Sequence, residues 1–343
     1  MINCPIYRLP GKLLQTFYGF IVIETMKDPS DLELSKEIHY FPAKHTLYDK
    51  YEKTRLYYRD VSNNFFLYKD KGITLPKIRV ERCKIPQLYI SESDKLESIM
   101  EMQDVFNKQI IEDIHSGNLP SVKNTLVTLM NETLSEPRSG NLQGLSKTID
   151  TLIDGYSKQP QFFSTIATLS TNNYSTTIHS INVSAMALGL CINMGFNEKK
   201  TKEIGLAALL HDTGKIYVPN EILNAQRRLT DNEFRIIQKH PLEGYKILKG
   251  AGFSETICQV TYQHHEKLNG FGYPKGLQTN NINNASQLVG LLDFYEAITN
   301  HDRPYRRADT PIDALSIIKV CVDKGELNSD IFEAMVQYLS FSK

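Results

Sequence analysis

The sequence lacks an excess of charge of either sign, since 39 Lys and Arg residues balance 39 Asp and Glu residues. Binding duplex nucleic acid through its phosphates needs a basic excess that releases counterions. A protein whose main role is to hold duplex nucleic acid is therefore excluded, although a small local basic site is not. The sequence also has no apolar run near the roughly 20 residues of a membrane span. The longest N-terminal run, residues 17–23, is only strand-sized.

Cysteine is scarce and follows no pattern. The five cysteines form no CxxC pair and are widely scattered, at Cys4, Cys83, Cys191, Cys258 and Cys321. An odd number without a pattern argues for reduced thiols in a reducing compartment, and against a disulfide framework or a thiolate zinc site. We therefore predict a cytoplasmic protein in which any bound metal has nitrogen and oxygen ligands.

The first 90 residues are rich in aromatic side chains, with 14 of the 33 Phe and Tyr residues of the chain. Short aromatic and β-branched runs, separated by turn residues, occupy residues 17–24, 54–58, 65–68 and 85–90. Residues 69–72 are predicted to form a turn. The pattern predicts a small mixed or mainly β domain over residues 1–90, with a regulatory or sensory role. Its aromatic residues form either an ordinary core or a ligand pocket or partner surface.

A helical period begins after residue 91. The apolar residues that repeat at helical spacing are Leu96, Ile99, Phe106, Ile110 and Ile114. A second helix is predicted from Pro120, followed by a polar loop at residues 135–141. We predict that residues 91–142 form connecting helices. They act either as a linker that transmits a signal and pairs into a homodimer, or as helices packed on their own domain. From residue 143 to the end the pattern is almost entirely helical.

The helical part of the chain contains a set of ionisable residues, most of them histidines. They are His179, His211, Asp212, Lys215, His240, His264, His265 and Asp293. A lone histidine in a helix is more often a packed or surface residue than a ligand, but here five of the nine histidines fall in four short motifs. Neutral imidazole and carboxylate are ligands that suit iron, manganese or zinc.

The segment that ends in His211 and Asp212 is a predicted helix with an apolar, buried body. A buried carboxylate beside a buried imidazole is costly unless a positive charge compensates. A metal cluster is the simplest compensator, and Lys215 returns toward the same site four residues after His211.

Several of these residues belong to linked motifs in a fixed order. The motifs are His211-Asp-Thr-Gly-Lys-Ile-Tyr-Val-Pro219, Lys239-His240-Pro241, His264-His265-Glu266, Gly270-Phe-Gly-Tyr-Pro274 and Asp302-Arg-Pro-Tyr-Arg306. In this order, from about residue 178 to 308, the chain resembles the HD-GYP family of the HD superfamily. Members of that family are helical phosphodiesterases that hydrolyse the bacterial second messenger cyclic di-GMP at a binuclear or trinuclear metal centre, usually iron-containing.

The resemblance implies an α+β chain in which an all-α, HD-type helical bundle, residues 143–343, follows the small β domain. It implies that the metal ligands are His179, His211, Asp212, His240, His264, His265 and Asp293, with Asp212 bridging two ions. It also implies that Lys215 contacts the scissile phosphate, that Arg303 and Arg306 hold substrate phosphates, and that the loop with Tyr273 borders the site. The alternative for the two arginines is a solvated surface turn. Tyr273 either packs against a base or pins its loop.

Physical chemistry agrees with these roles. Two metals about 3.5 to 4 Å apart can share a hydroxide, which then attacks the phosphorus. In this scheme Asp212 and Lys215 are the catalytic residues, because the lysine charge stabilises the transition state on the phosphate.

The metal number is predicted from a departure from the family. Trinuclear members carry a glutamate one turn before the first histidine, where this chain has Ser175. We therefore expect two divalent ions, iron or manganese, with zinc or nickel loaded on purification. Asn269 stands where many members have aspartate, so the substrate-side loops also differ.

The expected activity is hydrolysis of cyclic di-GMP to pGpG and GMP. Two alternatives are hydrolysis of another cyclic dinucleotide, and a catalytically weak module that binds the nucleotide or a signalling partner.

Overall fold

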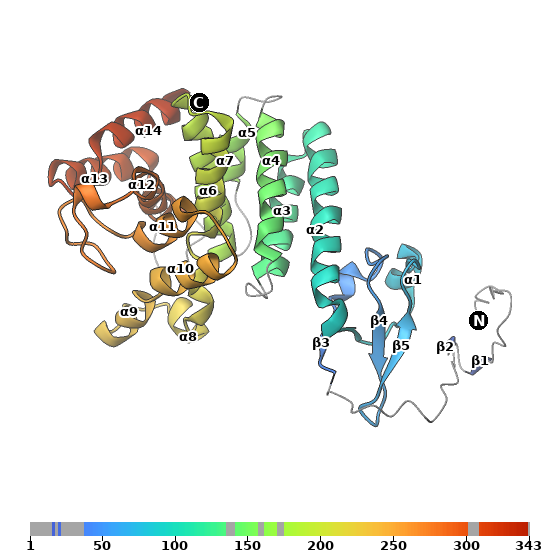
Figure 1. The fold of residues 1–343 in the computed structure, drawn as a ribbon. Coiled ribbons are helices and arrows are strands. Elements are labelled where there is room, and N and C mark those ends of the chain that lie inside the picture. The colour runs from blue at the N-terminus through green and yellow to red at the C-terminus, as the bar shows by residue number, and fades with distance from the viewer. Residues whose placement is uncertain are drawn as a thin grey trace. The chain divides into compact units, whose positions relative to one another are not determined.

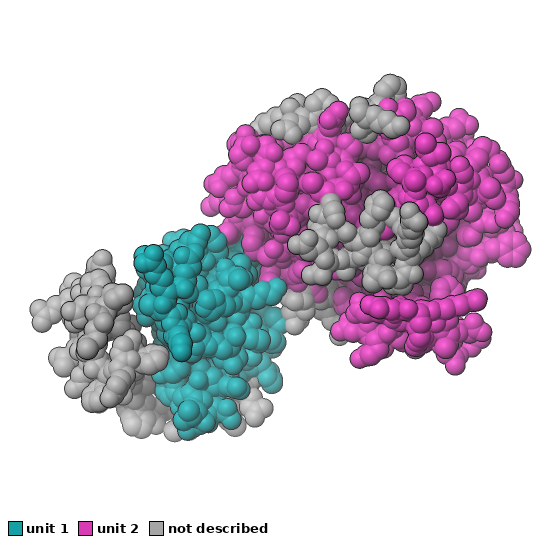
Figure 2. Space-filling view, turned by 180° about the vertical axis from the view of Figure 1, so that it is seen from behind, with its two compact units in different colours: residues 1–102 teal, residues 103–343 magenta. Residues whose placement is uncertain are grey.

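The computed structural model describes residues 38–134, 141–156, 161–169, 175–300 and 309–341, together with the short paired strands β1 (Thr16–Phe17) and β2 (Phe20–Ile21). The fold is α+β, with a small sheet near the N-terminus and helices through the rest (Figure 1). Two compact units divide the chain, residues 1–102 and 103–343 (Figure 2). Within the described ranges, every helix is too short or too polar to cross a membrane.

The N-terminal unit is built on a four-stranded antiparallel sheet with the order β3-β6-β4-β5. Its strands are β3 (Tyr40–Pro42), β4 (Leu56–Arg59), β5 (Phe65–Lys69) and β6 (Leu88–Ser91). The strands predicted around β4, β5 and β6 are confirmed, as is the turn after β5, where Gly72 has a φ of 76°. The prediction missed β3 and the helix α1 (Lys77–Arg82), which are too short for a period to show.

Aromatic side chains help to hold this unit together. Tyr48 is fully buried, and its hydroxyl accepts a hydrogen bond of 2.7 Å from the backbone N–H of Leu88. The ring of Tyr40 stacks on that of Phe65 at a centroid distance of 3.9 Å. The aromatic residues described in these contacts therefore serve as core and sheet packing.

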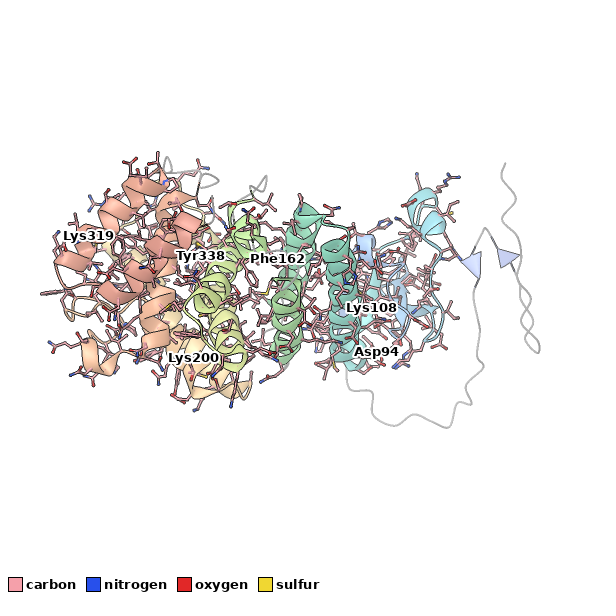
Figure 3. The ribbon with its side chains drawn as sticks, turned by 90° about the horizontal axis from the view of Figure 1, so that it is seen from above. Asp94, Lys108, Phe162, Lys200, Lys319 and Tyr338 are labelled. Atoms are coloured by element: carbon pink, nitrogen blue, oxygen red, sulfur yellow. The ribbon has the colours of Figure 1, made fainter. Side chains whose placement is uncertain are left out.

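The predicted amphipathic helix is confirmed as α2 (Glu92–His115), and Figure 3 shows Asp94 in its first turn. The next helix, α3 (Leu119–Leu134), begins one residue before the predicted Pro120. The boundary between the two units falls inside α2. Most of the predicted loop at residues 135–141 lies outside the described residues, and the connecting role of residues 91–142 stays a prediction.

The C-terminal unit is helical, as predicted. After α3 come η3 (Asn141–Gly144), α4 (Leu145–Tyr156), α5 (Phe162–Thr168), α6 (Thr176–Asn193), α7 (Glu198–Leu210), η4 (Thr213–Tyr217), α8 (Asn220–Leu223), α9 (Asp231–Ile237), α10 (His240–Gly250), α11 (Glu255–Gln263), η5 (Thr279–Asn281), α12 (Asn284–Thr299), α13 (Pro311–Asp323) and α14 (Ser329–Phe341).

Helix α6 is the centre of this unit, because its residues are mostly apolar or small and are buried along nearly its whole length. It packs against α5, α7, α12 and α14. A Cβ at Gly189 of α6 would lie 2.2 Å from the hydroxyl of Tyr338, so glycine is what lets α14 approach (Figure 3). The four cysteines in the described residues, Cys83, Cys191, Cys258 and Cys321, are free thiols.

Candidate metal centre

Five separate elements deliver the predicted metal ligands. His179 lies in α6, His211 and Asp212 follow α7, His240 begins α10, the pair His264 and His265 follows α11, and Asp293 lies in α12. All seven side chains come together in two groups, within each of which the ligand atoms lie within 4.8 Å of one another. We call Asp212, His240, His264 and His265 the first ligand group, and His179, His211 and Asp293 the second ligand group. Arg303 and Arg306 lie outside the described residues.

Two glycines allow these elements to approach closely. A Cβ at Gly214 in η4 would lie 2.0 Å from the carbonyl oxygen of His240, and a Cβ at Gly290 in α12 would lie 2.3 Å from that of His264. Real Cβ atoms do not approach a backbone oxygen so closely. Because glycine has no Cβ, these two positions allow the backbones that carry the ligands to come this close.

In the first ligand group, backbone carbonyls fix the tautomers of two imidazoles. Nδ1 of His240 lies 2.7 Å from the carbonyl oxygen of Ile237, and Nδ1 of His264 lies 2.9 Å from that of Thr261. Because a carbonyl oxygen only accepts, each Nδ1 carries the proton, and in the neutral ring Nε2 keeps a lone pair. This is the usual way in which a protein orients a histidine ligand.

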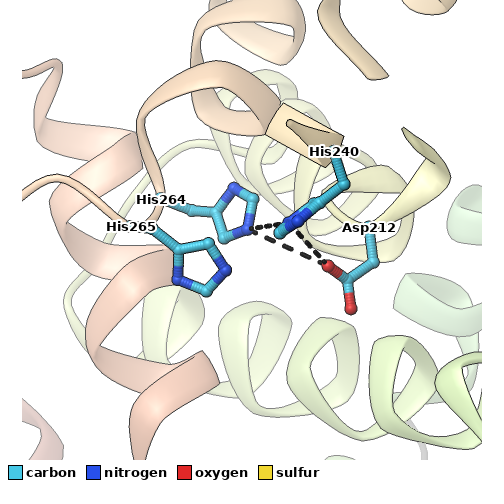
Figure 4. A group of neighbouring side chains, drawn as sticks. All are labelled: Asp212, His240, His264 and His265. Atoms are coloured by element: carbon cyan, nitrogen blue, oxygen red, sulfur yellow. Dashed lines mark hydrogen bonds and ion pairs between the residues drawn. The ribbon is translucent and has the colours of Figure 1, made fainter. Parts of the chain in front are cut away.

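The two lone pairs face each other. The Nε2 atoms of His240 and His264 are 3.3 Å apart, and Oδ1 of Asp212 lies 3.3 Å from the first and 3.9 Å from the second. Figure 4 shows these three side chains converging, with His265 beside them. In this neutral tautomer Nε2 has no proton to give, so these contacts are not hydrogen bonds, and Oδ1 of Asp212 is left without one. Three acceptors that meet without a donor call for a cation.

The second ligand group repeats the pattern. Nδ1 of His211 donates to the carbonyl oxygen of Ala208 at 2.7 Å, and its buried Nε2 has no hydrogen-bond partner. Nε2 of His179 lies 2.9 Å from Oδ1 of Asp293 and 3.8 Å from Oδ2 of Asp212. Asp212 is thus close to ligand atoms of both groups, as expected for a bridging carboxylate. The donor set of imidazole and carboxylate fits a divalent transition metal.

The charges of the site are tuned by burial and by these neighbours. Burial and the adjacent imidazoles hold the pKa of His264 well below its usual range, and burial lowers the pKa of His265 to about 3. Both rings are therefore neutral near pH 7. Burial alone would raise the pKa of Asp212, but Lys215 and His211 hold it well below its usual range, so the carboxylate is charged. Neutral imidazole and charged carboxylate are the forms that bind a metal.

Glu296 is a site residue to which the sequence assigned no role. Its carboxylate is buried, lies 2.5 Å from Nδ1 of His179 and accepts a hydrogen bond of 2.9 Å from Asn182. Burial alone would lower the pKa of His179, but Glu296 and Asp293 raise it to about 9. The one available signal was its position three residues after Asp293, on the same face of α12.

Glu266 was also missed as a positioning residue. Its carboxylate accepts hydrogen bonds from the backbone N–H groups of Lys275 at 2.7 Å and Leu277 at 2.9 Å. Tyr273, two residues before Lys275 in the same loop, has its ring 4.7 Å from that of His265 and donates its backbone N–H to the His265 carbonyl at 3.2 Å. Tyr273 therefore holds the loop against the ligands, and its predicted contact with a base stays a prediction.

A cavity of about 330 Å³ opens over the two ligand groups. Five of the seven ligands line it, together with Lys215, Lys267, Tyr273, Phe294, Cys321 and Glu326. Nζ of Lys215 lies 2.6 Å from Oδ2 of Asp212, which places the predicted phosphate-contacting lysine at the metal-facing side. The volume falls within the range of small-molecule sites.

Comparison with known proteins agrees with this geometry. Residues 155–325 match the family model of the HD domain. A cyclic di-GMP phosphodiesterase of Pseudomonas aeruginosa is 33% identical over 181 residues, which cover 52% of this chain and 43% of that protein. A 3'3'-cGAMP-specific phosphodiesterase of Vibrio cholerae is 32% identical over 159 residues, which cover 46% of this chain and 37% of that protein. The chain therefore spans less than half the length of these curated relatives.

Among solved structures, an HDG"Y"P protein from Bdellovibrio bacteriovorus covers 88% of this chain and 100% of its own, with a TM-score of 0.60 and 18% identity. At that identity the likeness is one of fold, and it agrees with the α+β architecture described above.

Proposed function

We propose that the chain, which carries an HD domain, belongs to the HD-GYP branch of that family, as its motifs predicted, and that it hydrolyses cyclic di-GMP to pGpG and onward to GMP. The observation that carries the proposal is the convergence of unprotonated Nε2 atoms and a carboxylate oxygen around Asp212. Such a cluster is costly in a buried site unless it holds a cation.

The residues present would hold two ions, one in each ligand group, with Asp212 shared between them. Ser175, where a third-ion glutamate would stand, accepts a hydrogen bond from the backbone N–H of Ile178 as the N-cap of α6. We propose iron as the native metal and manganese as a working substitute. When bound, divalent ions polarise phosphate oxygens and lower the pKa of water at the site.

The protein's own residues would complete the site. Lys215, held beside Asp212 and facing the cavity, donates to an oxygen of the scissile phosphate and stabilises the charge that grows there. It is also a proton source for the departing 3'-oxygen. Tyr273 and Glu266 keep the glycine-rich loop packed on His265, so that one wall of the cavity is fixed before the substrate arrives.

A second cyclic dinucleotide is a supported alternative substrate. The Vibrio cholerae relative is named as specific for 3'3'-cGAMP, and its identity to this chain is close to that of the cyclic di-GMP enzyme. The base therefore has to be tested directly.

The test is product analysis on cyclic di-GMP and on 3'3'-cGAMP, with metal quantification on the same anaerobically purified sample. We expect pGpG as the first product, two ions per chain, and at least tenfold faster turnover of cyclic di-GMP. Turnover of neither nucleotide by protein loaded with iron or manganese contradicts the proposal and leaves a binding module. Three ions per chain contradict the predicted metal number.

A further inference from the structure

We infer that the ion pair between Lys267 and Glu326 recognises the guanine base of the substrate. Glu326 would accept hydrogen bonds from N1–H and from the 2-amino group, and Lys267 would donate one to O6. The inference rests on the proposed function, because it assumes a guanine nucleotide in the cavity.

The pair shares a cavity with the metal-ligand groups. Lys267 and Glu326 line the same 330 Å³ cavity as the ligand histidines, and Phe294, Cys321 and Leu327 add apolar lining. The phosphate side of that cavity is defined by the ligand groups and Lys215. A nucleotide with its phosphate there would carry its base toward another part of the wall.

The other charged side chains described in the cavity wall belong to the phosphate side or hold the loop. Lys215 pairs with Asp212, Asp293 contacts His179, and Glu266 accepts from two backbone amides of the loop. Lys267 and Glu326 pair with each other and with no metal-ligand group in the described contacts. They are therefore the charged pair of the wall that a base could contact without displacing a metal ligand or the loop.

The backbone holds Glu326 rigidly. Gly325 adopts a φ of 67° at the end of α13, which lets the N–H of Glu326 donate to the carbonyl of Cys321 at 2.9 Å. The carbonyl of Glu326 in turn accepts from the N–H of Leu268 at 3.0 Å. The segments that follow α11 and α13 are thus hydrogen-bonded to each other beside the pair. The backbone that carries the Glu326 side chain, which is 18% exposed, is therefore held in position.

The hydrogen-bonding groups of the pair are complementary to the edge of guanine and not to that of adenine. Guanine presents two adjacent N–H donors next to the acceptor O6, and a carboxylate can accept both donors in a two-point contact. The ammonium group of Lys267 supplies the donor that O6 needs. Adenine presents one donor next to an unprotonated N1, whose lone pair would face the carboxylate and leave a polar group unsatisfied.

The experiment compares cyclic di-GMP with cyclic di-IMP, which lacks only the 2-amino group of each of its two bases. Wild-type protein should prefer cyclic di-GMP by roughly tenfold in kcat/KM, the loss expected for one hydrogen bond to a charged group. Glu326→Gln should lower kcat/KM for cyclic di-GMP and bring the ratio of the two substrates close to one. Lys267→Gln should slow both substrates and leave the ratio at its wild-type value, because both keep O6.

The matched control is Glu255→Gln, which removes an exposed partner of Lys249, at 2.6 Å, away from the cavity, and should leave both rates unchanged. If Glu326 only held two helix ends together, Glu326→Gln would slow both substrates equally and keep the ratio, which would overturn the inference. Equal rates on both substrates in the wild type would overturn it as well. If wild-type protein cleaves bis(p-nitrophenyl) phosphate but neither cyclic dinucleotide, the proposed function has failed, and the inference with it.

Discussion

Two buried carboxylates, one in each unit, are satisfied in opposite ways. In the N-terminal unit, Glu101 is 8% exposed and accepts hydrogen bonds from the backbone N–H groups of Glu52, Lys53 and Thr54, at 2.6, 2.6 and 3.1 Å, and from the Thr54 hydroxyl at 2.7 Å. In the C-terminal unit, Asp212 is 3% exposed and its Oδ1 accepts none.

Other buried charges of the N-terminal unit are satisfied by hydrogen bonds in the same way as Glu101. Asp94 forms a two-point contact with Arg55 at 2.8 and 2.9 Å, and Nζ of Lys69 donates to the carbonyls of Glu52 and Thr54. A buried charge whose hydrogen bonds are all satisfied contributes to the stability of the fold. A buried carboxylate oxygen that lacks a donor instead favours the binding of a ligand that compensates its charge. The comparison therefore separates a structural network from a ligand site without reference to any relative.

The largest expected effect is that of Asp212→Asn, which keeps the shape of the side chain and removes its charge. Hydrolysis should fall on the order of 10³-fold, because both ligand groups lose a shared carboxylate. Metal content should fall in the same sample, measured by elemental analysis beside the rate. Full activity in this variant would mean that Asp212 is not at the metal centre and that the comparison is wrong.

The matched isosteric change in the other unit is Glu101→Gln. It turns an acceptor oxygen into an amide donor that faces backbone N–H groups, so unfolding of the N-terminal unit should become easier by about 3 kcal/mol. Urea unfolding measures this, while activity per folded molecule should match the wild type. A change below about 0.5 kcal/mol would show that the network around Glu101 is not structural.

Removal of the metal should affect one unit only. An ion present at about 100 times its dissociation constant stabilises the folded state by about 2.7 kcal/mol. Chelation should therefore reduce hydrogen-exchange protection around α6, α7, α11 and α12, with protection in the sheet of the N-terminal unit unchanged. Equal loss in both units would contradict a site confined to residues 103–343.

A smaller effect is expected from Glu296→Gln. A carboxylate that holds a histidine ligand contributes about 10- to 100-fold in metal affinity, so metal should bind more weakly by that factor. Since Glu296 and Asp293 together raise the pKa of His179 to about 9, removal of the Glu296 charge should lower the pKa of this imidazole in the metal-free variant, which NMR titration can follow. An unchanged affinity together with an unchanged pKa would remove Glu296 from the site.

The sequence was informative where residue type and local period suffice. The helix ending at His211 and the strands β4, β5 and β6 were predicted from their own side chains, since a period is a local property. The prediction missed β3 and α1, because three to six residues carry too little pattern. Residues 301–308, with Arg303 and Arg306, are outside the described part of the chain, so their substrate contacts stay predictions.

By itself, then, the sequence determined which side chains could bind a metal, because imidazole and carboxylate lone pairs belong to the residue and the motifs keep a fixed order. Only the tertiary structure decided how these lone pairs are used. The tautomers of His211, His240 and His264 are set by carbonyls at helix ends, and the partner of His179 is Glu296, 117 residues away. Such contacts depend on how closely α6, α10 and α12 pack, which no local pattern contains.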